Sequence, residues 1–342
     1  MTITADEKYL RYALAFKQDE LNFRDELMTM LPRDIIDCHA HCNLIEHACF
    51  RDAAILSHPA STFSGFSLDD SKKIQKIFYP GKVVKTLRFP IPLMGIDFRR
   101  ANEYLLFESG EFDRVAVCGV PDDVGYTTEI IKNKKVIALK MYSFQFIPHA
   151  NKIYQFFKPE ILTMAEKIDI PIILHVPSFL DQCMEDLVSM LKDFPRLRVV
   201  LAHLGNPNFV ALGLKDNYRR INEFPNVYLD TSLVPCRDVI DVAFEVFGFE
   251  RIMFGSDEPF HLLRAMEYSN PKLGPRLITE YPYHWVDKDE HREYKHLARN
   301  AVHLHWLSLS ALVNVIKDRY GNGFERVAEK VFHDNAKLFF GF

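Results

Sequence analysis

The stretch Asp34-Ile35-Ile36-Asp37-Cys38-His39-Ala40-His41 decides how the rest of the chain must be organised. It predicts an apolar β-strand that ends in a His-x-His pair. Side chains two residues apart on a strand point to the same face, so His39 and His41 can present two imidazoles to one cation. Neutral imidazole suits zinc and its transition-metal neighbours, and a catalytic zinc usually has three protein ligands and one open position. Other strands must therefore end in His, Asp, Glu or Cys near the same point.

Composition and charge describe an ordinary globular protein. The chain has 342 residues, of which 48% are hydrophobic and 26% charged, and its formal net charge is −4. No block of like charge points to nucleic acid or a membrane surface, and no apolar run approaches the ~20 residues of a membrane span. No signal peptide is recognisable at the start, and six cysteines are scattered along the chain. We therefore expect reduced thiols and a cytoplasmic protein.

Strands and helices alternate along most of the chain. Most of the predicted strands are near-continuous apolar runs, which is typical of parallel strands buried on both faces. Eight such units predict an α/β fold of the closed (β/α)8 TIM-barrel type. An open doubly wound sheet is the alternative, but no Gly-rich phosphate loop follows any strand. The predicted strands cover residues 34–41, 83–89, 114–120, 136–142, 171–175, 197–203, 227–231 and 251–257.

We expect one domain over residues 1–342, with three additions to the barrel. Residues 1–33 are predicted to form a helical prelude, which packs on the barrel exterior or on a neighbouring subunit. Residues 44–82 form a long insertion with one helix at 67–78, and long loops of this kind are usually lids or binding elements. Residues 260–342 are predicted to form a helical extension, with an irregular segment at 260–295.

Polar side chains stand at the carboxyl ends of five predicted strands. In a barrel these ends form the catalytic face. A single histidine at a strand end is as readily a packing residue as a metal ligand. Five strands that end this way in one register, however, indicate a shared site. The residues are His39, His41, Lys140, His175, His203 and Asp257.

With these residues the chain resembles the metal-dependent amidohydrolase superfamily. It is most similar to the amidohydrolase-related branch, which includes hydrolases, lactonases and non-oxidative decarboxylases. The resemblance covers residues 34–259 and the C-terminus. The stretches that carry it are Ile36-Asp37-Cys38-His39-Ala40-His41, Ile173-Leu174-His175, Val200-Leu201-Ala202-His203-Leu204-Gly205, Phe254-Gly255-Ser256-Asp257-Glu258-Pro259 and Asn335-Ala336-Lys337-Leu338-Phe339.

The resemblance implies a role for each of these residues. His39, His41, His175 and Asp257 would hold one divalent metal, for which Zn²⁺ is expected. Asp257 would take a proton from the attacking water and pass it to the leaving group, and His203 would polarise the substrate carbonyl. In binuclear relatives a lysine in the place of Lys140 is carboxylated and bridges two metals, and His203 becomes a ligand of the second. We expect one metal and an unmodified Lys140 that binds a substrate carboxylate or pairs with Asp257.

Other residues are weaker candidates for substrate binding. Arg88 lies near the end of the second strand and Arg237 follows the seventh, so either could hold a substrate carboxylate through two hydrogen bonds. His261 follows Asp257 closely and is a candidate for the cavity wall. For each of the three, a structural or solvated side chain is the alternative.

Three functions remain open at this point. The preferred one is a metal-dependent hydrolase that cleaves an amide, ester or lactone of a small organic molecule. The second is a metal-dependent non-oxidative decarboxylase of an aromatic or unsaturated acid, and the third is a non-catalytic binding protein on the same fold. We expect a small-molecule substrate, no nucleic acid or membrane partner, and a homo-oligomer.

Overall fold

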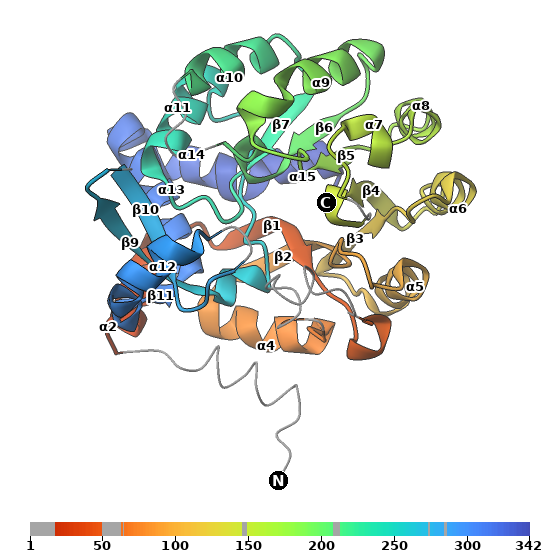
Figure 1. Ribbon diagram of the computed structural model, residues 1–342. Coiled ribbons are helices and arrows are strands. Elements are labelled where there is room, and N and C mark those ends of the chain that lie inside the picture. The colour runs from red at the N-terminus through yellow and green to blue at the C-terminus, as the bar shows by residue number, and fades with distance from the viewer. Residues whose placement is uncertain are drawn as a thin grey trace.

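An eight-stranded parallel sheet, in which each strand pairs with the next along the chain, lies at the centre of the protein (Figure 1). The computed structural model describes residues 18–49, 63, 65–145, 149–207, 213–272, 274–283 and 286–342. Hydrogen bonds from the Cys38 N–H to the Phe254 carbonyl (3.0 Å) and from the Asp257 N–H to the His39 carbonyl (2.8 Å) join the first strand to the segment after the last. The sheet is therefore a (β/α)8 TIM barrel, and the predicted fold class is confirmed. Its strands are β1 (Asp34–His41), β2 (Val83–Phe89), β3 (Asp113–Cys118), β4 (Val136–Met141), β5 (Ile172–Leu174), β6 (Val199–Leu201), β7 (Val227–Asp230) and β8 (Ile252–Met253).

Helices surround the barrel (Figure 1). The helix predicted at residues 67–78 is α4 (Leu68–Phe78), one residue shorter than predicted. No helix in the described residues is long and apolar enough to cross a membrane. The helices up to the end of the barrel are α2 (Gln18–Met30), α4 (Leu68–Phe78), α5 (Phe98–Glu108), α6 (Val124–Ile130), α7 (Ile153–Phe156), α8 (Pro159–Lys167), α9 (Leu180–Asp193), α10 (Leu214–Asn222) and α11 (Arg237–Phe247).

Alternate residues of the strands pack into two separate cores. Ile35 of β1 belongs to a large core that the strands share with the apolar faces of the surrounding helices. Its neighbour Ile36 belongs to a smaller core, which fills the barrel interior and includes Phe339 from the C-terminal end of the chain. The Phe339 ring lies 4.5 Å from the ring of Tyr228 near the start of β7. The end of the chain thus closes the amino-terminal end of the barrel, and the opposite end is left for a site.

The prelude and the insertion are described in part. Residues 1–17 of the prelude lie outside the described residues, and α2 is the part that can be tested. This helix packs on α13 (Leu304–Tyr320) of the same chain. In the insertion, α4 begins after Ser67, whose hydroxyl accepts a hydrogen bond from the Asp70 N–H. Residues 50–62 and 64 of the insertion lie outside the described residues.

The C-terminal extension is not wholly helical, and the prediction of an irregular segment at 260–295 was wrong. β9 (Arg264–Asn270) pairs antiparallel with β10 (Gly274–Thr279) and with β11 (Val302–His303). Pro275 is tolerated in β10 because this is an edge strand, where Pro275 need not donate a hydrogen bond. Helices of the extension are α12 (Lys288–Tyr294), α13, α14 (Phe324–Glu329) and α15 (Asn335–Phe340).

Candidate metal centre and cavity

Three predicted ligands meet at the carboxyl end of the barrel. The ligand atoms of His39, His41 and Asp257 all lie within 4.8 Å of one another, and all three side chains are buried. The Asp257 Oδ1 atom is 3.0 Å from His41 Nε2 and 3.3 Å from His39 Nε2. This is the only such group in the described residues that is buried and lies at the barrel mouth.

The hydrogen bond at Nδ1 of each ring determines whether its Nε2 atom carries a hydrogen or a free lone pair. The Nδ1 atom of His39 lies 2.9 Å from the Asp230 carboxylate, and Nδ1 of His41 lies 3.2 Å from the carbonyl oxygen of Pro90. Both partners are acceptors only, so each Nδ1 must carry the hydrogen. A neutral ring then has a bare Nε2 lone pair directed at the Asp257 carboxylate. Lone pairs and a carboxylate this close together are the donor set of a divalent cation, and the site fits one.

Electrostatics favour the neutral, ligating form of His41. Burial lowers the pKa of His41 to about 4, against the opposing effect of the Asp257 carboxylate. Burial alone would raise the pKa of Asp257, but the imidazoles of His39, His41 and His203 beside it hold that pKa well below the usual range. Burial alone would lower the pKa of His39, but the charge of Asp230 and the contacts with the Asp230 and Asp257 carboxylates together raise it. At neutral pH the centre therefore contains ionised carboxylates beside imidazoles.

His203 and His175 lie beside this group and line the same cavity. The His203 ring is 5.0 Å from that of His39 and 4.7 Å from that of His175, and His175 stacks on Tyr142 at 4.1 Å. Nδ1 of His203 lies 2.7 Å from the Ser232 carbonyl oxygen, so a neutral His203 presents a bare Nε2. Burial lowers the pKa of both rings. The assignment of His175 as a fourth ligand remains a prediction.

Lys140 lies in the same cavity wall and is fully buried. Its Nζ atom has no hydrogen-bond partner among the described residues, and it lies 5.5 Å from the centre of the Phe89 ring. Burial lowers its pKa to about 8, although the charges of Asp230 and Asp257 oppose this change. A buried ammonium without a hydrogen bond is costly, so this group is available to an anionic ligand.

Asp230 was missed by the sequence reasoning. It ends β7, and its carboxylate accepts hydrogen bonds from Nδ1 of His39 and from the backbone N–H of His203 (3.0 Å). The same side chain accepts the N–H of Ser232 at 3.1 Å. It thus orients two site histidines at once. Its place at a strand end, like that of the other site residues, was the signal that could have identified it.

The Asp230→Asn variant is expected to bind zinc about 10–100-fold more weakly than the wild type. An amide at this place can present its NH₂ to Nδ1 of His39, which then carries its hydrogen on Nε2 and loses its ligating lone pair. A zinc titration against a competing chelator measures the change. Asp216→Asn, at an exposed residue of α10, is the control. Equal affinity in Asp230→Asn and wild type would contradict the orienting role.

Two of the site residues adopt an unusual backbone conformation. Asp257 and His203 have φ values of +59° and +54°, in the left-handed region that non-glycine residues rarely adopt. Such outliers cluster at functional sites, where the surrounding structure holds them. Gly255 is needed nearby because a Cβ atom there would lie 2.8 Å from Cβ of His39. The backbone after β8 is therefore shaped to bring Asp257 onto the histidines.

The metal centre opens into a cavity of about 590 Å³. Aromatic side chains from the barrel loops form part of its wall, with Tyr142, Phe144, Phe179 and Phe260 among them. The C-terminal extension contributes Arg276, Leu277 and Thr279 from β10, and Asp287 and Glu290 from the start of α12. The extension is thus part of the site.

The structure does not bring the other expected substrate-binding residues into this cavity. Arg88 is buried (1% exposed) and is held by Asp113 at 2.6 Å and Glu258 at 2.9 Å, so its guanidinium is an internal ion pair. Arg237 is 53% exposed and pairs with Asp318 on the outer surface. His261 is buried against Phe78 and is absent from the residues that line the cavity. The sequence placed Arg88 at the correct strand end but could not show its partners.

Buried histidines outside the cavity predict acid sensitivity. Burial, followed by the charges of neighbouring histidines, lowers the pKa of His261 to about 3 and that of His305 well below its ordinary value. The unfolded chain takes up these protons near a pKa of roughly 6.5, and the folded chain takes them up at lower pH. The free energy of unfolding should therefore fall as pH drops below ~6.5, by about 1.4 kcal/mol per pH unit for each group.

In the His305→Leu variant, the free energy of unfolding is expected to fall less steeply as the pH drops. The slope should be smaller by about 1.4 kcal/mol per pH unit, because one proton-binding group is absent. Urea unfolding between pH 7.5 and 5 measures the slope, with His296→Leu at an exposed residue as the control. Equal slopes in His305→Leu and wild type would show that His305 is not involved.

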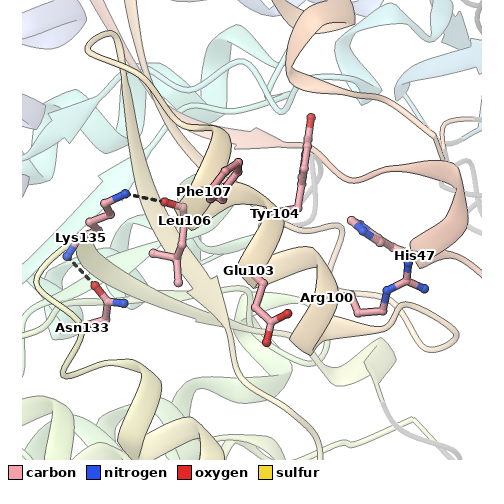
Figure 2. Close-up of a pocket in the computed structure, with 8 residues that line it drawn as sticks. All are labelled: His47, Arg100, Glu103, Tyr104, Leu106, Phe107, Asn133 and Lys135. Atoms are coloured by element: carbon pink, nitrogen blue, oxygen red, sulfur yellow. Dashed lines mark hydrogen bonds between the residues drawn. The ribbon is translucent and has the colours of Figure 1, made fainter.

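A second hollow, of about 610 Å³, lies over α5 on the outside of the barrel (Figure 2). Lys135 and Asn133 lie at one end of it and His47 and Arg100 at the other. The Lys135 ammonium already donates to the Leu106 carbonyl at 2.8 Å. None of the predicted site residues is near, so the chemistry belongs to the barrel mouth.

The fold and the buried cluster together define a metal-binding (β/α)8 barrel. The chain belongs to the amidohydrolase family, because the family model described as Amidohydrolase matches residues 36–342. The predicted superfamily is thereby confirmed. No curated protein matches the chain.

Solved structures of low sequence identity share this fold. One is an amidohydrolase from Burkholderia multivorans with bound zinc, with 15% identity, a TM-score of 0.59, and coverage of 90% of this chain and 99% of that one. Another is a 5-carboxyvanillate decarboxylase from Sphingomonas paucimobilis, with 13% identity and a TM-score of 0.58. The match covers 91% of this chain and 99% of that one. A third is a probable 2-pyrone-4,6-dicarboxylic acid hydrolase from Acinetobacter baumannii with bound citric acid, with 13% identity and a TM-score of 0.56. The match covers 90% of this chain and 99% of that one.

Proposed function

We propose that this protein is a metal-dependent hydrolase that cleaves an amide, ester or lactone bond of a small organic molecule, with zinc as its metal. The observation that carries the proposal is the pair of bare Nε2 atoms, of His39 and His41, which face the Asp257 carboxylate. This arrangement supplies ligands for a cation, and the adjoining cavity has the size of a small-molecule site. The zinc in the Burkholderia multivorans structure supports the choice of metal.

Each residue of the metal centre has a proposed role in hydrolysis. His39, His41 and Asp257 would hold the metal, with His175 as the fourth proposed ligand. When bound, a zinc ion supplies Lewis acidity and makes water a better nucleophile at neutral pH. Asp257 is the proposed acceptor for the proton that water loses as it attacks the carbonyl carbon, and the donor of that proton to the leaving group. General acid–base catalysis of this kind typically contributes about 10²–10⁴-fold.

The hydrogen-bonding pattern bears on which group stabilises the developing oxyanion. A neutral His203 offers an acceptor to the cavity, because its Nδ1 hydrogen is directed to the Ser232 carbonyl. It can stabilise an oxyanion only when doubly protonated. The Lys140 ammonium is a donor whenever it is charged, and it has no hydrogen-bond partner among the described residues. We therefore assign substrate anion binding to Lys140, and propose one metal with this lysine unmodified.

Non-oxidative decarboxylation is the second candidate, and Lys140 is the observation that favours it. A buried cation at the cavity wall can hold a substrate carboxylate beside the metal site. The 5-carboxyvanillate decarboxylase from Sphingomonas paucimobilis shares the fold, which is compatible with this reaction on such a barrel.

Metal analysis and a two-arm assay test the proposal. Protein freed of metal with a chelator and reloaded with zinc is incubated with lactones, esters and amides, and separately with aromatic acids while carbon dioxide is followed. We expect about one zinc per chain and hydrolysis that zinc restores. Release of carbon dioxide without hydrolysis would favour the decarboxylase, and about two metals per chain would contradict the single-metal site with an unmodified Lys140. Metal-independent hydrolysis would contradict both candidates.

A further inference from the structure

The C-terminal extension brings a second cation to the cavity. Arg276 of β10 lines the same cavity as the metal-centre histidines, although it comes from a sheet outside the barrel. Its side chain is 33% exposed, so it is only partly covered by the protein. Figure 1 shows β9, β10 and α12 gathered together on one side of the barrel. Lys140 and Arg276 are thus two cations of the cavity wall that come from separate sheets.

Arg276 is only loosely engaged by the protein itself. Its Nε and Nη2 atoms each lie 3.4 Å from an oxygen of Glu290, which is long for an arginine–carboxylate pair. Glu290 has other donors, because its Oε1 accepts the Tyr268 hydroxyl at 2.5 Å and the Asn270 amide at 3.0 Å. Glu290 is therefore held without Arg276, and the guanidinium retains the capacity to bind an acceptor in the cavity.

The other acidic residue that the extension brings to the cavity, Asp287, forms no ion pair with Arg276 among the described residues. Asp287 caps α12, and its carboxylate accepts the N–H groups of Asp289 at 2.9 Å and Glu290 at 2.8 Å. Apolar side chains also line the cavity, including Leu93, Phe144, Phe260, Leu277 and Val286. The lining therefore suits a ligand with an apolar body and an anionic group.

We propose that Arg276 is a specificity-determining residue that binds a carboxylate of the substrate remote from the bond that is broken. This inference rests on the proposed function, because it treats the cavity as the substrate site. The substrate class it specifies is a small acid with an apolar, preferably aromatic, body, whose distal carboxylate takes both N–H groups of the guanidinium fork.

A binding experiment without turnover tests the assignment. The zinc-loaded protein is titrated calorimetrically with benzoate and with benzene-1,3-dicarboxylate, which differ by one carboxylate. The wild type is expected to bind the dicarboxylate roughly tenfold to a hundredfold more tightly, the range for a hydrogen bond to a charged group. Arg276→Gln should remove this preference and leave benzoate affinity unchanged, which also shows that the cavity is intact. Arg292→Gln, on the exposed face of α12, is the matched control and should retain the preference.

Three results would overturn the assignment. They are equal binding of the two acids by the wild type, a preference that survives in Arg276→Gln, and an equal loss of affinity for both acids in that variant. None of them depends on catalysis, so the failure of this inference is distinct from a failure to hydrolyse any substrate.

Discussion

The Asp257→Asn variant is expected to lose about 10²–10⁴-fold or more of the turnover while it keeps its fold. The substitution removes the proposed proton acceptor and one ligand of the metal centre. The fold should survive because the new amide can donate to the bare Nε2 of His41, which lies 3.0 Å from the Asp257 carboxylate. Turnover of the best substrate from the hydrolase assay, zinc content and urea unfolding are measured on the same preparation.

The matched control for this variant is Asp181→Asn, at an exposed residue in the first turn of α9. It removes the same charge away from the cavity and should leave both turnover and zinc content at the wild-type level. If Asp257→Asn bound zinc normally and retained its turnover, the assignment of Asp257 would be refuted. Loss of zinc together with loss of turnover would identify Asp257 as a ligand, whereas loss of turnover at normal zinc content would identify it as the acid–base group.

The Arg88→Met variant is expected to lower the free energy of unfolding by about 3–5 kcal/mol, the cost of removing one partner from a buried ion pair. Arg88 is the cation between Asp113 and Glu258, and Glu258 also accepts the Ser71 hydroxyl from α4. Burial raises the pKa of Glu258 to about 7 even with Arg88 beside it. Without the cation that pKa rises further, so the loss of stability should diminish as the pH falls and Glu258 is protonated.

Arg237→Met supplies the contrast, because both arginines were candidates for a substrate clamp. Its ion pair with Asp318 is exposed, so the free energy of unfolding should change by less than about 1 kcal/mol. Urea unfolding of the two variants at pH 8 and pH 6 is the measurement. An Arg88→Met protein of normal stability whose KM alone rises would restore the substrate-clamp interpretation.

The sequence predicted the barrel well because its signals are local. Apolar runs, helix periodicity and the Pro and Gly residues that end helices and strands depend only on neighbours along the chain. The extension was harder, because the pairing of β9 with β10 and β11 depends on segments far apart and its edge strand contains Pro275. The short β8, Ile252–Met253, was predicted too long because the segment after it is shaped by contacts with β1.

The sequence by itself determined the parallel barrel and the set of strand ends that carry histidine, lysine and aspartate, because strand topology brings the carboxyl ends together without further information. It could not decide which nitrogen of each histidine faces the cavity, since that depends on acceptors such as Asp230 and Pro90 from other strands. Only the tertiary structure showed that Arg88 is internal and that Arg276 reaches the site. The physical reason is that hydrogen-bond partners and burial are properties of packing between distant segments.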